Sequence, residues 1–380
     1  MGAFMTFRRS APALLISIVA IVIAGLTFLS DRLFSGLTAA VEEGQFQLMQ
    51  SILDTTLRRA ADDALARAEI VAAMPSARQA VAAKDRDRLL AEFNEMFAIQ
   101  KERRGVDQVQ FHLPPAMSLL RLHAPQRSGD DLSRFRPMVV TVNRERAARN
   151  GLAIAATGPA IFGVAPVRDP QGNHAGTVEF GLNFGPLLDG LKAAYGLELA
   201  LFMQEKQLRE FATGIDPALL SDQNRVGPFM RIHATNRDLL RQLARDGDIA
   251  AVNEPARYTR EAQDVPYGVL LMPLRDDAGQ SLGVIAVARD FSGSRAAAGR
   301  SLVWQMCLAA FAIILLAGVV IVVLRGLLLR PLEVLDRRLA ALAEGGQGGI
   351  SEPSDRFCTE MQRLAERAGA IAAAAKGRAS

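Results

Sequence analysis

Two long uncharged apolar stretches divide the chain into two ends and a large segment between them. The first is residues 11–30, APALLISIVAIVIAGLTFLS, and the second is residues 302–324, LVWQMCLAAFAIILLAGVVIVVL. A helix rises about 1.5 Å per residue, so each stretch is long enough to cross a hydrocarbon core of about 30 Å. The pattern predicts two transmembrane helices that flank a domain of residues 31–301.

A cleaved signal peptide is the alternative for the first stretch, because Arg8 and Arg9 precede it. However, its apolar run is longer than the roughly 7–15 residues of a signal-peptide core, and the following TFLSDRLF has no A-x-A cleavage site. We therefore expect an uncleaved membrane anchor.

Positive charge next to the spans predicts the orientation in the membrane. Basic residues favour the cytoplasmic side of a span, and arginines lie in residues 1–10 and directly after the second span, at Arg325, Arg330, Arg337 and Arg338. Arg295 and Arg300, on the other side, weaken this asymmetry without reversing it. We expect a two-pass protein of the bacterial inner membrane, with both termini cytoplasmic and residues 31–301 in the periplasm. Two spans enclose no solute path, so the plan suits signalling better than transport.

Composition indicates how the outer domain is stabilised and which partners it lacks. The chain has two cysteines, Cys307 and Cys358, and neither lies in residues 31–301, so this domain has to be stabilised by an apolar core instead of disulfides. The net charge is +4, but acidic and basic residues are mixed along the chain. We read them as a solvated surface and expect no nucleic-acid partner.

Hydrophobic periodicity predicts an α+β domain. Apolar residues at helical spacing predict a long helix over 31–73, which Pro75 ends, and a second helix over 76–100. The spacing then changes to two in QVQFHLP and SLLRLH, which predicts a pair of strands. Further alternating runs predict more strands; one of them is DIAAV, which begins at Asp248.

A repeated string indicates that this domain is duplicated. PVRDPQGNHAG begins at Pro166, and PLRDDAGQSLG begins at Pro273. Any hairpin with a D-x-x-G turn looks similar, but identities continue on both sides of this turn without a gap. They predict two similar α+β modules, a distal one over about residues 101–195 and a proximal one over about 196–292. The identical pairs are Arg168/Arg275, Asp169/Asp276, Gly172/Gly279, Gly176/Gly283 and Phe184/Phe291.

With this repeat and the stretch FHLPPAMSLLRLHAPQRSGDDLSRFRPMVV, residues 31–301 resemble the tandem (double) Cache sensory domains of bacterial chemoreceptors and sensor kinases. The resemblance implies a long N-terminal helix and two antiparallel-sheet modules. It also implies that a small molecule binds in a pocket of the distal module.

Polar residues on two neighbouring predicted strands are candidates for that pocket. Gln110 and His112 share one strand face, Arg121 and His123 share one face of the next, and Glu179 lies on the non-apolar face of TVEFG. Imidazole and guanidinium groups that converge would suit a carboxylate or another anion. One alternative is that these residues form the solvated face of an antiparallel sheet. A metal site of His112, His123 and Glu179 is the other, although their spacing matches no known signature.

The segment after the second span, residues 325–376, carries apolar residues at coiled-coil spacing on both sides of GGQGG. With Arg330 and Pro331 at its start, it resembles the HAMP linker, which implies a homodimer; amphipathic helices on the lipid surface are the alternative. We read residues 377–380 as a short tail and expect no output domain, and the sequence shows no cofactor motif or catalytic motif. We expect a sensory receptor, not an enzyme, that acts on a cytoplasmic partner in trans. A truncated receptor or a non-signalling binding and dimerisation scaffold is the competing hypothesis.

Overall fold

A computed structural model describes residues 2–323 of the chain, together with positions 325, 326, 330, 333, 334, 336, 337, 340, 363 and 367. The predicted HAMP-like linker and the C-terminal tail fall almost entirely outside the described residues and stay predictions. Residues 39–294 form one compact unit, and the residues before and after them are grouped in another.

Helices α1 (Gly2–Ala73) and α9 (Ser292–Val323) carry the two apolar stretches. Among the described residues, one helix is long and apolar enough to cross a membrane, Val303–Val323. In α1, the described apolar part is the shorter run Ile16–Ser30. One candidate span is thus present at the position predicted for the second transmembrane helix, and the first transmembrane span stays a prediction.

The helix predicted over residues 76–100 is in fact two helices, α2 (Pro75–Ala83) and α3 (Arg86–Arg104). Lys84 takes the left-handed conformation, with φ of 56°, and ends α2. The carboxylate of Asp85 then accepts a hydrogen bond from the Arg88 backbone N–H at 3.0 Å and caps α3. The prediction of one helix over 76–100 was therefore wrong, because local capping outweighed a continuous apolar pattern.

The distal module contains a five-stranded antiparallel sheet of order β2-β1-β5-β4-β3. The predicted strand pair is confirmed as β1 and β2, which join in a tight hairpin. The strands are β1 (Val106–Leu113), β2 (Met117–Arg121), β3 (Arg149–Ala155), β4 (Gly158–Arg168) and β5 (His174–Asn183), with helices α4 (Pro137–Glu145) and α5 (Phe184–Tyr195).

The proximal module contains a six-stranded antiparallel sheet of order β7-β8-β6-β11-β10-β9. Its strands are β6 (Glu198–Gln204), β7 (Arg225–Val226), β8 (Phe229–Ala234), β9 (Ala256–Ala262), β10 (Val265–Arg275) and β11 (Ser281–Asp290). Its helices are α6 (Glu205–Phe211), α7 (Arg237–Leu243) and α8 (Asp246–Ala250), and two 3-10 turns, η1 (Pro217–Leu220) and η2 (Asp222–Asn224), precede β7. The strand predicted for DIAAV is wrong: Asp248 accepts a hydrogen bond from the Arg245 backbone N–H at 3.0 Å and starts the helix α8.

The two sheets repeat one strand plan, since β2-β1-β5-β4-β3 corresponds to β8-β6-β11-β10-β9. The repeated turn has the same geometry in both copies: Gly172 and Gly279 have φ of 91° and 82°, a region that favours glycine. A Cβ at Gly176 would lie 2.2 Å from the His112 carbonyl oxygen, and one at Gly283 would lie 2.1 Å from that of Phe202. The pattern of identities therefore reflects matching backbone constraints.

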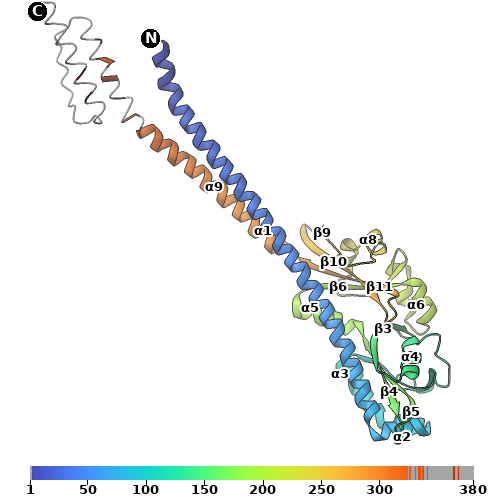
Figure 1. Ribbon diagram of the computed structural model, residues 1–380. Helices are drawn as coiled ribbons and strands as arrows, with labels where there is room; N and C mark the ends of the chain where they lie inside the picture. Colours follow the sequence, from blue (N-terminus) through green and yellow to red (C-terminus); the bar gives the residue numbers. More distant parts are fainter. Residues whose placement is uncertain are drawn as a thin grey trace, which may run out of the picture. The chain divides into compact units, whose positions relative to one another are not determined.

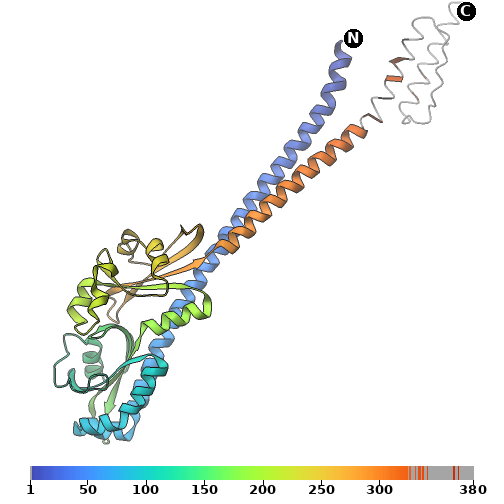
Figure 2. The same cartoon turned by 180° about the vertical axis from the view of Figure 1, so that it is seen from behind.

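One core cluster joins α1 to both sheets within residues 39–294. Figures 1 and 2 show this part of α1 running along the two modules. The backbones approach closely at Gly163 of β4, where an added Cβ would lie 2.1 Å from the backbone nitrogen of Leu65. The fully buried Ala64 and Ala68 of α1 are small enough to permit this approach. The opposite face of each sheet packs against α4 in the distal module and α7 in the proximal module.

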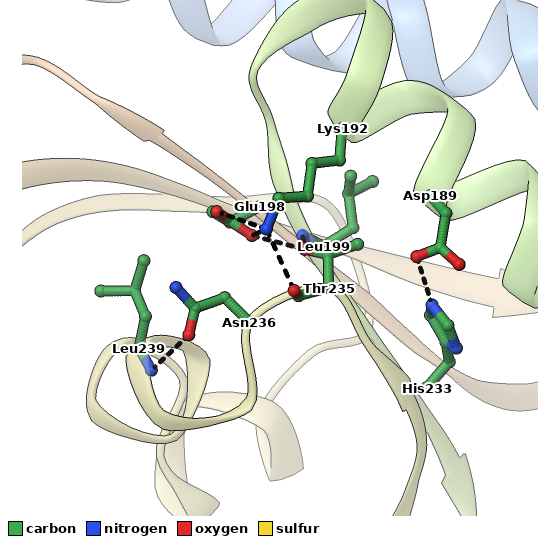
Figure 3. A network of polar contacts seen from close by, with 8 residues as sticks. All are labelled: Asp189, Lys192, Glu198, Leu199, His233, Thr235, Asn236 and Leu239. Atoms are coloured by element: carbon green, nitrogen blue, oxygen red, sulfur yellow. Dashed lines mark hydrogen bonds and ion pairs between the residues drawn. The ribbon is translucent and has the colours of Figure 1, made fainter.

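Helix α5 is fastened to the proximal sheet by polar contacts (Figure 3). Lys192 pairs with Glu198 and donates a hydrogen bond to the Thr235 carbonyl oxygen, both at 3.0 Å. The Thr235 hydroxyl donates to Glu198 at 2.5 Å and accepts from the Leu199 N–H at 2.9 Å. These contacts connect the end of the distal module to β6 and β8.

Candidate ligand-binding site

Strand pairing brings three of the five predicted site residues into one row. Gln110 in the centre of β1 lies opposite Arg121 of β2 on one side and Glu179 of β5 on the other. Residues directly opposite each other in an antiparallel sheet project from the same face. Arg121, Gln110 and Glu179 therefore share the sheet face that carries α4.

A cavity of about 370 Å³ lies on this side of the sheet. Gln110, Arg121 and His123 line it, whereas His112 and Glu179 are not part of its lining. The alternative of a solvated sheet face does not hold, because Gln110 and Glu179 are buried, with exposures of 4% and 1%. The polar side chains of the lining are Gln108, Gln110, Arg121, His123, Arg127, Asp130, Arg136, Thr157 and Thr213.

Arg121 is held in place by the loop that follows β2. It donates two hydrogen bonds to the carboxylate of Asp130, at 2.8 and 2.7 Å, and a third to the Arg127 carbonyl oxygen at 3.0 Å. These bonds keep the pKa of Asp130 below its usual value. The bidentate geometry fixes the guanidinium plane at the cavity wall.

Arg136, which the sequence analysis missed, is the most buried cation of the cavity. It forms an ion pair with Glu179, and the two side chains are 6% and 1% exposed. Its guanidinium carbon lies 4.0 Å from the ring centroid of Phe162, a cation–π arrangement. A Cβ at Gly181 would approach Phe162 to 2.5 Å, so glycine makes room for this ring. Glu179 thus fixes Arg136 from behind the cavity and does not face a ligand directly.

The two predicted histidines have different surroundings. His123 lines the cavity, and burial together with the neighbouring Arg121 lowers the pKa of its imidazole to about 4. His112 is completely buried; its Nδ1 lies 3.4 Å from the Thr177 hydroxyl. Burial, and then the charge of Arg136, lowers the pKa of His112 well below its usual value. Both rings are therefore neutral near pH 7.

Two buried nitrogen atoms of the cavity lining have no hydrogen-bond partner among the described residues. They are Nη1 of Arg136 and Nδ1 of His123. Arg127 adds a third, exposed guanidinium, and Asp130 is the acidic residue of the lining. A buried donor without a partner is costly, so an acceptor that enters the cavity would satisfy Arg136. The arrangement suits a small molecule with negative charge.

The structure does not assemble the alternative metal site. His112, His123 and Glu179 do not form a ligand cluster, and no group of three or more His, Cys, Asp or Glu side chains within the described part of the chain does. His112 instead belongs to a buried network with Thr177 and Asn143.

The same row of the proximal sheet is apolar. Ala200 of β6 lies opposite Ala234 of β8 and Ala286 of β11, where the distal sheet has Gln110, Arg121 and Glu179. Leu239, Leu240 and Leu243 of α7 pack onto this face in one buried cluster. The repeat thus contains one polar row beside a cavity and one alanine row beneath leucines.

Some cavity-lining residues that were not predicted have a recognisable pattern in the sequence, and others have none. Gln108 continues the period-two face of Gln110, and its amide donates to the Thr157 hydroxyl at 2.6 Å. Arg136 precedes Pro137 at the start of α4, a pattern that marks a helix start but no site. Phe211, Thr213 and Gly214 reach the cavity from the proximal module, which no local pattern could indicate.

Comparison with known families identifies the domain. Residues 40–293 match the double Cache family described as the double sensory domain of two-component sensor kinases. The chain belongs to this family. The resemblance to tandem Cache domains is thereby confirmed, and the double Cache match ends within one residue of Ser292, the start of α9. This family is a sensory, ligand-binding domain and not a catalytic one.

Solved structures with weak overall similarity include sensory domains. The ligand-binding domain of the Campylobacter jejuni chemoreceptor Tlp3 in complex with L-norvaline is 10% identical, with coverage of 72% of this chain and 93% of that one and a TM-score of 0.35. The extracellular domain of a candidate histidine kinase, vpHK1S-Z8, is 8% identical, with coverage of 65% and 95% and a TM-score of 0.38. A sequence comparison with curated proteins gives no match.

Proposed function

We propose that the protein is a two-pass membrane receptor whose distal Cache module binds a small anionic ligand. The observation that carries this proposal is the cavity beside the polar row, with the guanidinium groups of Arg121, Arg127 and Arg136 in its lining. Family membership supports ligand sensing as the general role. The chemistry of the ligand rests on the cavity alone.

Charge argues for an anion over a cation. Asp130 is bound to Arg121, and Glu179 is bound to Arg136, so both carboxylates are already neutralised by protein cations. Arg127 has no ion pair among the described residues, and Arg136 keeps one nitrogen without an acceptor. A ligand with one or two carboxylate or phosphate groups could satisfy both.

Signal relay is the wider part of the proposal. Residues 11–30 and 302–324 would cross the inner membrane, with the sensory domain in the periplasm and both termini in the cytoplasm. Two chains would form a homodimer, and the HAMP-like segment would pass the movement of α9 to a cytoplasmic partner in trans. A ligand can shift the equilibrium between two arrangements of the domain only if it binds one of them more tightly than the other.

A thermal-unfolding screen of the full chain in detergent tests ligand binding. Succinate, citrate, L-aspartate and inorganic phosphate would be compared with the cation putrescine. An anion at a hundredfold its Kd should stabilise the domain by about 2.7 kcal/mol. Stabilisation by putrescine alone, or by none of the five compounds, would contradict the proposed ligand class.

Two charge-matched variants locate the site. Arg127→Gln should weaken anion binding about tenfold, since one exposed charge-assisted hydrogen bond is lost. Arg241→Gln, at an exposed position of α7 in the proximal module, should leave the Kd unchanged. Equal losses in both variants would indicate a general charge effect instead of a site.

Cross-linking separates a receptor from a non-signalling scaffold. Single cysteines along α9, in a chain with Cys307 and Cys358 replaced by serine, would be oxidised with and without the best anion of the screen. A receptor should change its cross-linking pattern when the anion binds, whereas a scaffold should not.

A further inference from the structure

The connection between the first two strands of the repeat differs most between the modules. In the distal module, residues 114–116 join β1 to β2, and in the proximal module, residues 205–228 join β6 to β8. The first part of the longer connection, residues 205–215, contains α6 and is called the α6 segment here. Because the strand order is otherwise the same, the α6 segment is an addition to the shared plan (Figure 1).

The α6 segment contacts the distal module through three kinds of interaction. The Gly214 N–H donates a hydrogen bond to the Ala156 carbonyl oxygen at 2.8 Å. Glu210 pairs with Arg134 at 2.7 Å. The rings of Phe211 and Phe135 meet edge to face, with centroids 5.9 Å apart. The peptide hydrogen bond and the aromatic pair both lie at the cavity, because Ala156, Phe135, Phe211 and Gly214 line it.

The other side of the α6 segment is fixed in the proximal module. Leu208 is completely buried and Ala212 is 3% exposed, and both belong to the main core cluster. The segment follows β6 directly, and β6 pairs with β11. Strand β11 ends at Asp290, and α9 begins at Ser292. A displacement of the α6 segment therefore acts on the strand next to the one that continues into α9.

We infer that the α6 segment is a wall of the ligand site, with Phe211 and Thr213 in contact with the ligand, and that it carries the occupancy of the distal cavity to the proximal sheet. This inference rests on the proposed binding of an anion in that cavity. A ligand that touches both modules favours the arrangement in which its contacts with both are made. The Thr213 hydroxyl can donate a hydrogen bond to the ligand, and Phe211 supplies an apolar surface.

A tethered anion tests the inference without knowledge of the natural ligand. In the full chain with Cys307 and Cys358 replaced by serine, Arg127→Cys would place a thiol at the cavity for modification with 2-sulfonatoethyl methanethiosulfonate. The uncharged 2-hydroxyethyl reagent provides a comparison at the same cysteine. Hydrogen–deuterium exchange with mass spectrometry should show amides of residues 205–215 and 198–204 exchanging several-fold more slowly with the sulfonate than with the uncharged group. Slower exchange confined to residues 106–157, or absent everywhere, overturns the inference.

A second variant separates relay from simple binding. With the sulfonate attached, Phe211→Ala should keep the slower exchange of residues 106–157 but lose that of residues 198–204. If residues 198–204 of β6 still exchange more slowly in this variant, the assigned role of Phe211 is overturned. The sulfonate attached instead to Arg241→Cys, in the proximal module, should leave residues 205–215 unchanged. Because the tether needs no natural affinity, failure of the free anions in the thermal screen would count against the proposed ligand class and leave this result standing.

Discussion

Arg136 and Glu179 form an ion pair in which both charged groups are shielded from solvent, with exposures of 6% and 1%. Removing both ions from water is costly, and loss of either member would leave the other as an uncompensated buried charge. The pair therefore links the stability of the distal module to the position of a cavity-lining guanidinium.

Replacing one member should cost more than replacing both. Arg136→Met should reduce the free energy of unfolding by about 3–5 kcal/mol, because it leaves the Glu179 carboxylate buried without a cation. The double variant Arg136→Met/Glu179→Leu should cost clearly less than the two single variants added together. Urea denaturation of the four chains in detergent, followed by circular dichroism, measures this cycle. Additive costs would mean that the two groups do not interact.

His123 should make the stability fall in mild acid. Its pKa is about 4 in the folded domain and about 6.5 when exposed, so the unfolded chain binds the extra proton between these values. The contribution is fully present above about pH 6.5 and is lost as the pH falls toward 4, with a magnitude of about 3 kcal/mol.

The variant His123→Gln isolates this effect. The pH dependence of the unfolding free energy between pH 4 and 7 should become shallower in the variant. It should not vanish, because the pKa of His112 is lowered in the same direction. Parallel curves for the two chains would show that His123 does not titrate as described.

Gly163 should not tolerate a methyl group. Gly163→Ala would place Cβ against the Leu65 backbone, which cannot move aside without shifting α1. We expect a loss of about 1–3 kcal/mol, toward the upper end. Gly190→Ala is the control: Gly190 lies exposed in α5 with open space around it, and alanine should stabilise the helix by about 0.5–1 kcal/mol. Equal effects of both substitutions on the melting temperature would refute the close contact.

The Thr235 hydroxyl should contribute more to the free energy of unfolding than its methyl group. Thr235→Val removes the acceptor for the Leu199 N–H and the donor to Glu198, and we expect a loss of about 1–3 kcal/mol. Thr235→Ser keeps the hydroxyl and should cost less than about 1 kcal/mol. Denaturation of both variants gives the comparison, and a serine variant as unstable as the valine one would assign the effect to packing.

The regular parts of the fold could be predicted because their signals are local. The period-two face of Gln110 and His112 predicted β1, and the turn glycines predicted the repeated hairpin. The wrong predictions lie where a single capping residue determines the secondary structure, as at Asp85 and Asp248. Each of these carboxylates caps the start of a helix against the surrounding apolar pattern.

The candidate site could be predicted only where strands pair. Gln110 was placed with His112 on one strand face, and Arg121 with His123 on the next, because this alternation is visible in the sequence; the pairing of β1 with β2 then sets Gln110 opposite Arg121. Arg136 was missed, since its partner Glu179 is distant along the chain and the pairing depends on how α4 packs over the sheet. Phe211 was missed because it comes from the other module.

The alanine row of the proximal sheet has a consequence for engineering. A polar substitution at Ala286 alone would meet the leucines of α7, so adding a second recognition site to this chain requires a smaller helix face as well as a new row. The reverse change, alanines in the distal row with a larger residue on α4, would remove the polar row of the distal sheet and leave the strand order unaltered. Such a chain would show how much of the proposed anion binding depends on that row.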